Sequence, residues 1–126
     1  MSEGKNRILI IEDDTYISDM YKIKLEADGF AVKVSPDGQS GLDEIKIMKP
    51  HLVLLDVIMP KMDGFSVLQN IKSNPEFKDI PVVMLTNLGQ KDSVEKGLEL
   101  GADGYIIKAH FTPSEVVEKI KEILNK

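Results

Sequence analysis

Polar side chains that could bind a metal ion and a phosphoryl group follow four short apolar runs in this sequence. One run leads into two adjacent carboxylates and another into a single carboxylate, while the other two lead into a hydroxyl and an amine: Glu12-Asp13, Asp56, Thr86 and Lys108. Carboxylate oxygens are ligands that Mg²⁺ prefers, and a carboxylate can act as a nucleophile. Phosphoryl transfer depends mostly on positioning and on stabilising charge, and these residue types can provide both.

The apolar runs have the length of β-strands. A short run without polar alternation is typical of a strand buried on both faces of a parallel sheet. Another run carries a charge, Lys33, at its centre and is expected at a sheet edge. The predicted strands are Arg7–Ile11, Ala31–Ser35 (the edge strand), His51–Leu55, Pro81–Leu85 and Gly104–Ile107.

Segments with helical spacing of apolar residues separate these strands, and the last one begins with a capping box at Thr112, Pro113 and Glu115. Strict alternation of strand and helix predicts an α/β fold, βα repeated five times, with helices on both faces of a parallel sheet. Because such crossovers are right-handed, the carboxyl ends of all five strands meet at one edge. Asp56, at the end of a central strand, then lies where open α/β sheets bind their ligands.

Three consecutive acidic residues, Glu12-Asp13-Asp14, follow the first strand. Carboxylates this close repel one another unless a cation lies among them. Capping of the next helix by Asp14 or Thr15 would account for one acidic residue but not for three. The oxygen-rich set suits Mg²⁺ with several waters retained, and such an ion would draw an anionic phosphoryl donor toward Asp56.

The composition limits the possible classes of function. The chain has 126 residues, and we expect a single domain over residues 1–126. A net charge of −5 argues against direct binding to nucleic acid. The absence of cysteine excludes disulfides and thiolate metal sites. Because no apolar stretch approaches the ~20 residues that span a bilayer, and no signal-peptide region is seen, we expect a cytoplasmic protein without a membrane partner.

The motifs together resemble the receiver domains of two-component response regulators, in particular single-domain regulators of the chemotaxis type. The similarity runs from Arg7 to Leu124 and is carried by five segments: Ile10-Ile11-Glu12-Asp13-Asp14, Leu54-Leu55-Asp56, Met59-Pro60-Lys61-Met62-Asp63-Gly64, Leu85-Thr86 and Tyr105-Ile106-Ile107-Lys108. The resemblance implies a doubly wound, flavodoxin-like fold with strand order 2-1-3-4-5, which agrees with the edge position of Ala31–Ser35.

The resemblance also implies a function. The domain would be a phosphoacceptor signalling switch and not an enzyme, catalysing only its own phosphorylation and slow dephosphorylation. Asp56 would accept a phosphoryl group from a sensor histidine kinase or a phosphotransfer protein in a Mg²⁺-dependent reaction. The metal ligands would be Glu12, Asp13, Asp56 and the backbone carbonyl of Ile58.

Signal output is implied by the same resemblance. Thr86 and Lys108 would contact the phosphoryl group, and Thr86 and Tyr105 would form the switch, with Tyr105 turning inward on activation. A downstream protein would bind the face made by the fourth helix, the last strand and the last helix.

Two positions depart from the family pattern. The family usually has a proline after the lysine, joined by a cis peptide bond, but here Ala109 follows Lys108. The bond is then either trans, with Lys108 placed differently, or a strained cis bond. Asn87 stands where a small residue is commoner, and its bulk is expected to narrow the approach to Asp56.

Other classes of protein share parts of this pattern. Flavodoxin-like proteins have a hydroxyl- and glycine-rich phosphate loop where this chain has carboxylates that repel phosphate. The P-loop sequence of nucleotidases is absent. A haloacid-dehalogenase-type phosphatase needs a second acid two residues after its nucleophile, where this chain has Ile58. The alternative that remains is a degenerate receiver that acts as a phosphorylation-independent protein-interaction module.

Overall fold

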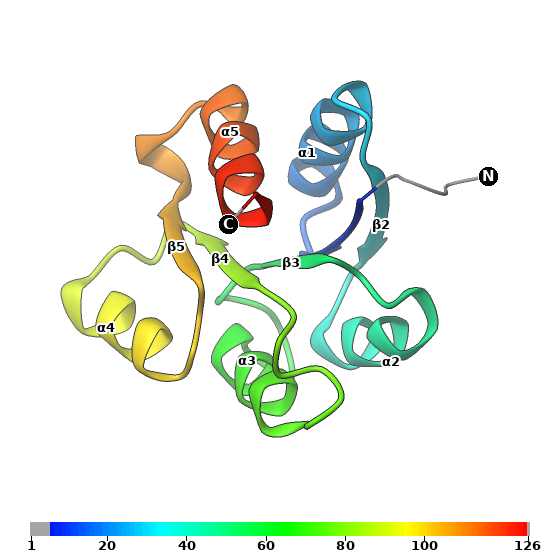
Figure 1. Cartoon of the computed structure of the whole chain (residues 1–126). Helices are drawn as coiled ribbons and strands as arrows, with labels where there is room; N and C mark the ends of the chain where they lie inside the picture. The colour runs from blue at the N-terminus through cyan, green and yellow to red at the C-terminus, as the bar shows by residue number, and fades with distance from the viewer. Residues whose placement is uncertain (1–5, 126) are drawn as a thin grey trace.

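A five-stranded parallel sheet forms the centre of the computed structural model, which describes residues 6–125 (Figure 1). The strand order is β2-β1-β3-β4-β5, as the resemblance implied. The strands are β1 Arg7–Ile11, β2 Ala31–Ser35, β3 Leu52–Leu55, β4 Val82–Thr86 and β5 Gly104–Ile107. Every residue of β3 and β4 is buried, whereas Lys33 of β2 is exposed at the sheet edge, so the predicted central and edge positions are confirmed.

Helices cover both faces of the sheet, as predicted. Figure 1 shows α1 and α5 together on one face and α2, α3 and α4 on the other. Each layer buries its own apolar core, one centred on Leu25, Leu54 and Ile120, the other on Leu55, Leu68 and Ile71. The helices are α1 Thr15–Ala27, α2 Gly38–Met48, α3 Gly64–Ser73, α4 Lys91–Glu99 and α5 Pro113–Leu124.

The helix ends follow local sequence signals. Asp14 caps α1 by accepting hydrogen bonds from two backbone N–H groups, and Thr112 and Glu115 form the predicted capping box of α5. Gly29 and Gly101, just after α1 and α4, have φ angles of 93° and 104°, which glycine adopts readily. No helix within residues 6–125 is long and apolar enough to cross a membrane.

A short 3₁₀ helix, η1 (Lys108–His110), follows β5. The sequence did not predict this element. It matters for the site because it places the backbone of Lys108 directly at the carboxyl end of β5, and the Lys108–Ala109 peptide bond within it is trans.

Candidate functional site

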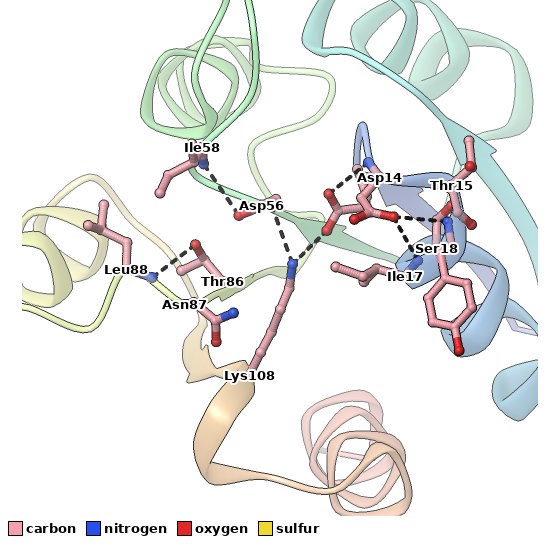
Figure 2. A network of polar contacts seen from close by, with 12 residues as sticks. Asp14, Thr15, Ile17, Ser18, Asp56, Ile58, Thr86, Asn87, Leu88 and Lys108 are labelled. Atoms are coloured by element: carbon pink, nitrogen blue, oxygen red, sulfur yellow. Dashed lines mark hydrogen bonds and ion pairs between the residues drawn. The ribbon is translucent and has the colours of Figure 1, made fainter.

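The four polar strand ends meet at one edge of the sheet, as predicted. Glu12 follows β1, Asp56 follows β3, Thr86 is the last residue of β4 and Lys108 follows β5. Parallel pairing fixes their relative height: Ile11 is in register with Leu55 and Thr86 with Ile107. Glu12 and Asp56, one residue beyond that first pair, are therefore level with each other. Because Leu55 is in register with Met84, and Met84 with Tyr105, Thr86 lies one residue and Lys108 two residues farther along the sheet. The long Lys108 side chain reaches back to the two carboxylates (Figure 2).

Three carboxylates gather at this edge. Glu12, Asp13 and Asp56 each place one carboxylate oxygen within 4.8 Å of the others. Glu12 and Asp56 are buried, with 5% and 8% of their surface exposed, whereas Asp13 is exposed. The donor set consists of hard oxygen atoms with one side open to solvent, which fits a divalent cation such as Mg²⁺ that keeps several waters.

Asp14, the third residue of the acidic run, has a different role. One of its carboxylate oxygens accepts hydrogen bonds from the N–H groups of Tyr16 and Ile17, at 3.0 and 3.2 Å. Its own backbone N–H donates to Glu12 Oε2 at 3.1 Å. The capping explanation therefore holds for Asp14, and two of the three consecutive acids remain for the site.

Lys108 lies between the two buried carboxylates. Its Nζ donates to Glu12 Oε1 at 2.6 Å and to Asp56 Oδ2 at 3.4 Å, and 11% of its side chain is exposed (Figure 2). Burial works against its charge, but the hydrogen bond to Glu12 and the charge of Asp56 outweigh burial and raise the pKa of Lys108. The ammonium therefore contacts both Glu12 and Asp56 even though no proline follows Lys108.

Glu12 is the carboxyl group whose charge the fold disfavours. Burial raises its pKa, and the negative charge of Asp56 adds to that effect, while the bonds from Lys108 and the Asp14 amide oppose it. With all three carboxylates ionised, the single ammonium of Lys108 leaves an excess of negative charge at the sheet edge. A bound cation would remove this excess.

Asp56 is oriented by the loop that follows it. Its Oδ1 accepts a hydrogen bond from the Ile58 N–H at 3.3 Å, while Oδ2 faces Lys108. The Ile58 side chain is 61% exposed beside this carboxylate. The role of the Ile58 carbonyl as a metal ligand stays a prediction.

Thr86 and Tyr105 are joined through Leu88. The Thr86 side chain is fully buried, and its Oγ1 accepts a hydrogen bond from the Leu88 N–H at 3.2 Å. The Tyr105 hydroxyl donates to the Leu88 carbonyl at 2.5 Å, and its half-buried ring lies against Gly97 of α4. Burial, with a smaller effect from Asp56, raises the pKa of Tyr105. The two predicted switch residues thus share one neighbour, although the switch itself stays a prediction.

Sequence reasoning missed one contact beside the site. The Asn87 side chain accepts a hydrogen bond from the Ala109 N–H at 3.0 Å. The sequence drew attention to Asn87 only for its bulk. The signal for the contact was present at position 109, because alanine, unlike proline, carries an N–H group that needs an acceptor.

Comparison with known proteins gives a consistent result. A family model described as "Response regulator receiver domain" matches residues 8–121. The chain is 40% identical over 120 residues to the DNA-binding dual master transcriptional regulator RpaA of Synechocystis sp., covering 95% of this chain and 49% of that protein. It is 37% identical over 126 residues to the probable transcriptional regulator ycf27 of Cyanophora paradoxa, covering 51% of that protein. The chain thus spans about half the length of these curated relatives.

Solved structures share the fold along their whole length. A CheY-like response regulator receiver domain protein from Methanospirillum hungatei superimposes with a TM-score of 0.90 and 33% identity, covering 97% of this chain and 95% of that one. The BeF3-activated receiver domain of Klebsiella pneumoniae RstA gives a TM-score of 0.89 and 29% identity, covering 96% of this chain and 100% of that one.

Proposed function

The chain belongs to the response regulator receiver domain family, and on that premise we propose that Asp56 accepts a phosphoryl group in a Mg²⁺-dependent reaction. The donor is a sensor histidine kinase or a phosphotransfer protein. The observation that carries the proposal is the position of Asp56: it is buried at the end of a central strand, within 4.8 Å of two further carboxylates and 3.4 Å from an ammonium. The domain is a phosphoacceptor regulatory module and not an enzyme.

The transfer forms one bond and breaks one. A carboxylate oxygen of Asp56 attacks the phosphorus atom, and the bond from phosphorus to the donor's histidine nitrogen breaks, with its electron pair leaving on the imidazole. When bound by Glu12, Asp13 and Asp56, Mg²⁺ would offset the negative charge of the phosphoryl oxygens and of the carboxylates.

The chain's own residues prepare this step. The Ile58 N–H holds one oxygen of Asp56, and the Lys108 ammonium is placed to bind a phosphoryl oxygen. The Thr86 hydroxyl uses its oxygen to accept from Leu88, so its proton remains available to donate to a phosphoryl oxygen. Such a bond would alter the link from Thr86 through Leu88 to Tyr105.

This link leads to the surface proposed for signal output. Tyr105 belongs to β5 and packs on α4, so a change at Thr86 reaches the face formed by α4, β5 and α5. We assign the downstream protein partner to this face. The DNA binding named for one relative is not extended to this chain, whose net charge is −5.

The intact mass of the protein tests the proposal. Wild type and Asp56→Asn are incubated with acetyl phosphate, with Mg²⁺ or with a chelator. We expect wild type to gain the mass of one phosphoryl group only with Mg²⁺, and Asp56→Asn to gain none. A wild type that gains no mass would support the alternative, a degenerate receiver that acts only as an interaction module.

A further inference from the structure

Asn87 and Ala109 link the two strand ends that carry Thr86 and Lys108. Asn87 directly follows Thr86 and Ala109 directly follows Lys108, and Thr86 is in register with Ile107 across β4 and β5. Just beyond the paired strands, the Asn87 side-chain oxygen accepts the Ala109 N–H at 3.0 Å. The contact therefore continues the connection between two neighbouring strands where their backbone pairing has ended.

The bond fixes the backbone from which the Lys108 side chain departs. A peptide unit is planar and contains the Cα of the residue before it. Holding the Ala109 N–H therefore holds the plane that begins at the Lys108 Cα. Lysine has a flexible four-carbon stem that does not by itself fix the ammonium, so a fixed Cα narrows the region that the ammonium can occupy.

The turn that contains Lys108 has few other restraints. The first N–H groups of a helical turn have no partner inside the turn, and η1 has no side-chain cap at its start. Among residues 6–125, Asn87 is the only side chain that hydrogen-bonds the backbone of Lys108–His110, whose Ala109 and His110 are exposed. Figure 2 shows the Asn87 side chain between Thr86 and Lys108.

We propose that Asn87 is a positioning residue for phosphorylation, acting through the Ala109 N–H to hold the Lys108 ammonium toward Asp56. The inference rests on the proposed function, because the reaction it serves is phosphoryl transfer to Asp56. Asn87 does not touch the reacting atoms. Its effect on the rate therefore depends on the presence of the Lys108 amine.

The test is a double-mutant cycle on the rate of phosphorylation by acetyl phosphate with Mg²⁺. Asn87→Leu keeps the approximate volume of the side chain but has no acceptor, and Asn87→Ala removes both. Each is measured alone and in combination with Lys108→Ala, and the exchange rate of the Ala109 amide is followed by NMR in parallel. Melting temperatures show that the variants fold.

We expect both Asn87 variants to react about three- to tenfold more slowly than wild type, the factor that one hydrogen bond provides. In both, exchange of the Ala109 amide should be faster. In the Lys108→Ala background the same substitutions should leave the rate unchanged.

Three results would overturn the proposal: an unchanged rate in both Asn87 variants, a loss in Asn87→Ala but not in Asn87→Leu, or an equal loss with and without Lys108. The second would show that bulk at position 87 matters and the acceptor does not. Failure of the proposed function is distinguishable from all three, because wild type itself would then take up no phosphoryl group.

Discussion

The two edges of the sheet use charged residues in opposite ways. At the amino-terminal edge, Arg7, Lys72 and Asp103 connect the ends of neighbouring elements through hydrogen bonds to partners of complementary character. At the carboxyl-terminal edge, three carboxylates face one another, and a single ammonium contacts two of them. The first arrangement stabilises the fold, whereas the second leaves an excess of negative charge that a cation could offset.

Arg7 and Lys72 organise the amino-terminal edge. The Arg7 guanidinium donates to the carbonyls of Met48 and Lys49 at the end of α2, at 2.8 and 2.7 Å, where a helix leaves its last carbonyls unpaired. Lys72 Nζ donates to the Ile80 carbonyl at 2.8 Å and to Asp103 Oδ2 at 3.1 Å. These contacts tie helix ends to the starts of the strands.

Asp103 shows how complete this pairing is. The same carboxylate oxygen that accepts from Lys72 also accepts from the Val82 N–H at 2.8 Å, so one group joins α3, β4 and the residue before β5. At the carboxyl-terminal edge, the carboxylates of Glu12, Asp13 and Asp56 repel one another. Burial also raises the pKa of Glu12. The comparison shows that the conflicting charges described here lie at the edge that carries the proposed metal and phosphoryl site.

The largest effect on stability is expected from Lys72→Met. The change leaves the Ile80 carbonyl and Asp103 without their ammonium donor, and the Lys72 side chain is only 17% exposed. We expect the free energy of unfolding to fall by about 2 kcal/mol, measured by urea denaturation, with phosphoryl uptake unchanged. A loss of phosphoryl uptake without a loss of stability would show that Lys72 serves phosphorylation and not the stability of the fold, which would contradict the contrast between the two edges.

A smaller effect on stability, with the opposite sign, is expected from Asp13→Asn. The change removes one of three clustered like charges, so the metal-free protein should gain roughly 0.5 kcal/mol. Its Mg²⁺ affinity, measured by titration, should fall about tenfold or more because one of few charged ligands is lost. Unchanged Mg²⁺ affinity, or a lower melting temperature without metal, would contradict the description of this edge.

The smallest effect concerns His51 and the pH. Its Nδ1 accepts the Arg7 backbone N–H at 2.8 Å, and burial, together with the Arg7 charge, lowers the pKa of His51. The unfolded chain therefore binds this proton more readily than the folded one. The stabilisation is complete above about pH 6.5 and is lost as the pH falls through the lowered pKa.

His51→Gln tests this pH dependence. A glutamine carbonyl can accept the Arg7 N–H at any pH, so the variant should lose less stability than wild type between pH 7 and pH 5, measured by urea denaturation. His110→Gln, at an exposed position, is the matched control and should retain the wild-type dependence. If the free energy of unfolding falls equally between pH 7 and pH 5 in wild type and in His51→Gln, protonation of His51 does not contribute to the pH dependence of stability.

The carboxyl edge was predictable from sequence because it follows from strand order and strand length. Apolar runs that end in Glu12, Asp56, Thr86 and Lys108 identify buried strands, and the parallel topology then brings their ends together. The helix boundaries carry local signals of their own, such as the capping box at Thr112. These features depend on nearest neighbours along the chain or on a general rule of chain direction.

The amino edge was not predictable in the same way. Nothing in the sequence near Lys72 indicates that it meets Ile80 and Asp103, since the contact depends on how α3 packs against the sheet. The contact of Asn87 with Ala109 is similar: alanine at position 109 indicates an N–H that needs an acceptor, but the sequence does not indicate that a residue 22 positions away provides it. Leu98, in the short helix α4, is 49% exposed although it is apolar. Contacts between side chains far apart in the sequence, and the extent to which a short helix is buried, can be seen only in the tertiary structure.

A matched pair of substitutions, Asp56→Ala and Asp103→Ala, tests the central claim most directly. Both remove an aspartate that lies near a lysine ammonium, one at each edge of the sheet. For each variant the intact mass after acetyl phosphate and Mg²⁺ is measured together with the melting temperature of the metal-free protein. Asp56→Ala should take up no phosphoryl group and keep or raise its melting temperature, while Asp103→Ala should be phosphorylated and melt at a lower temperature. A phosphoryl group on Asp56→Ala, or equal destabilisation by the two substitutions, would contradict the account.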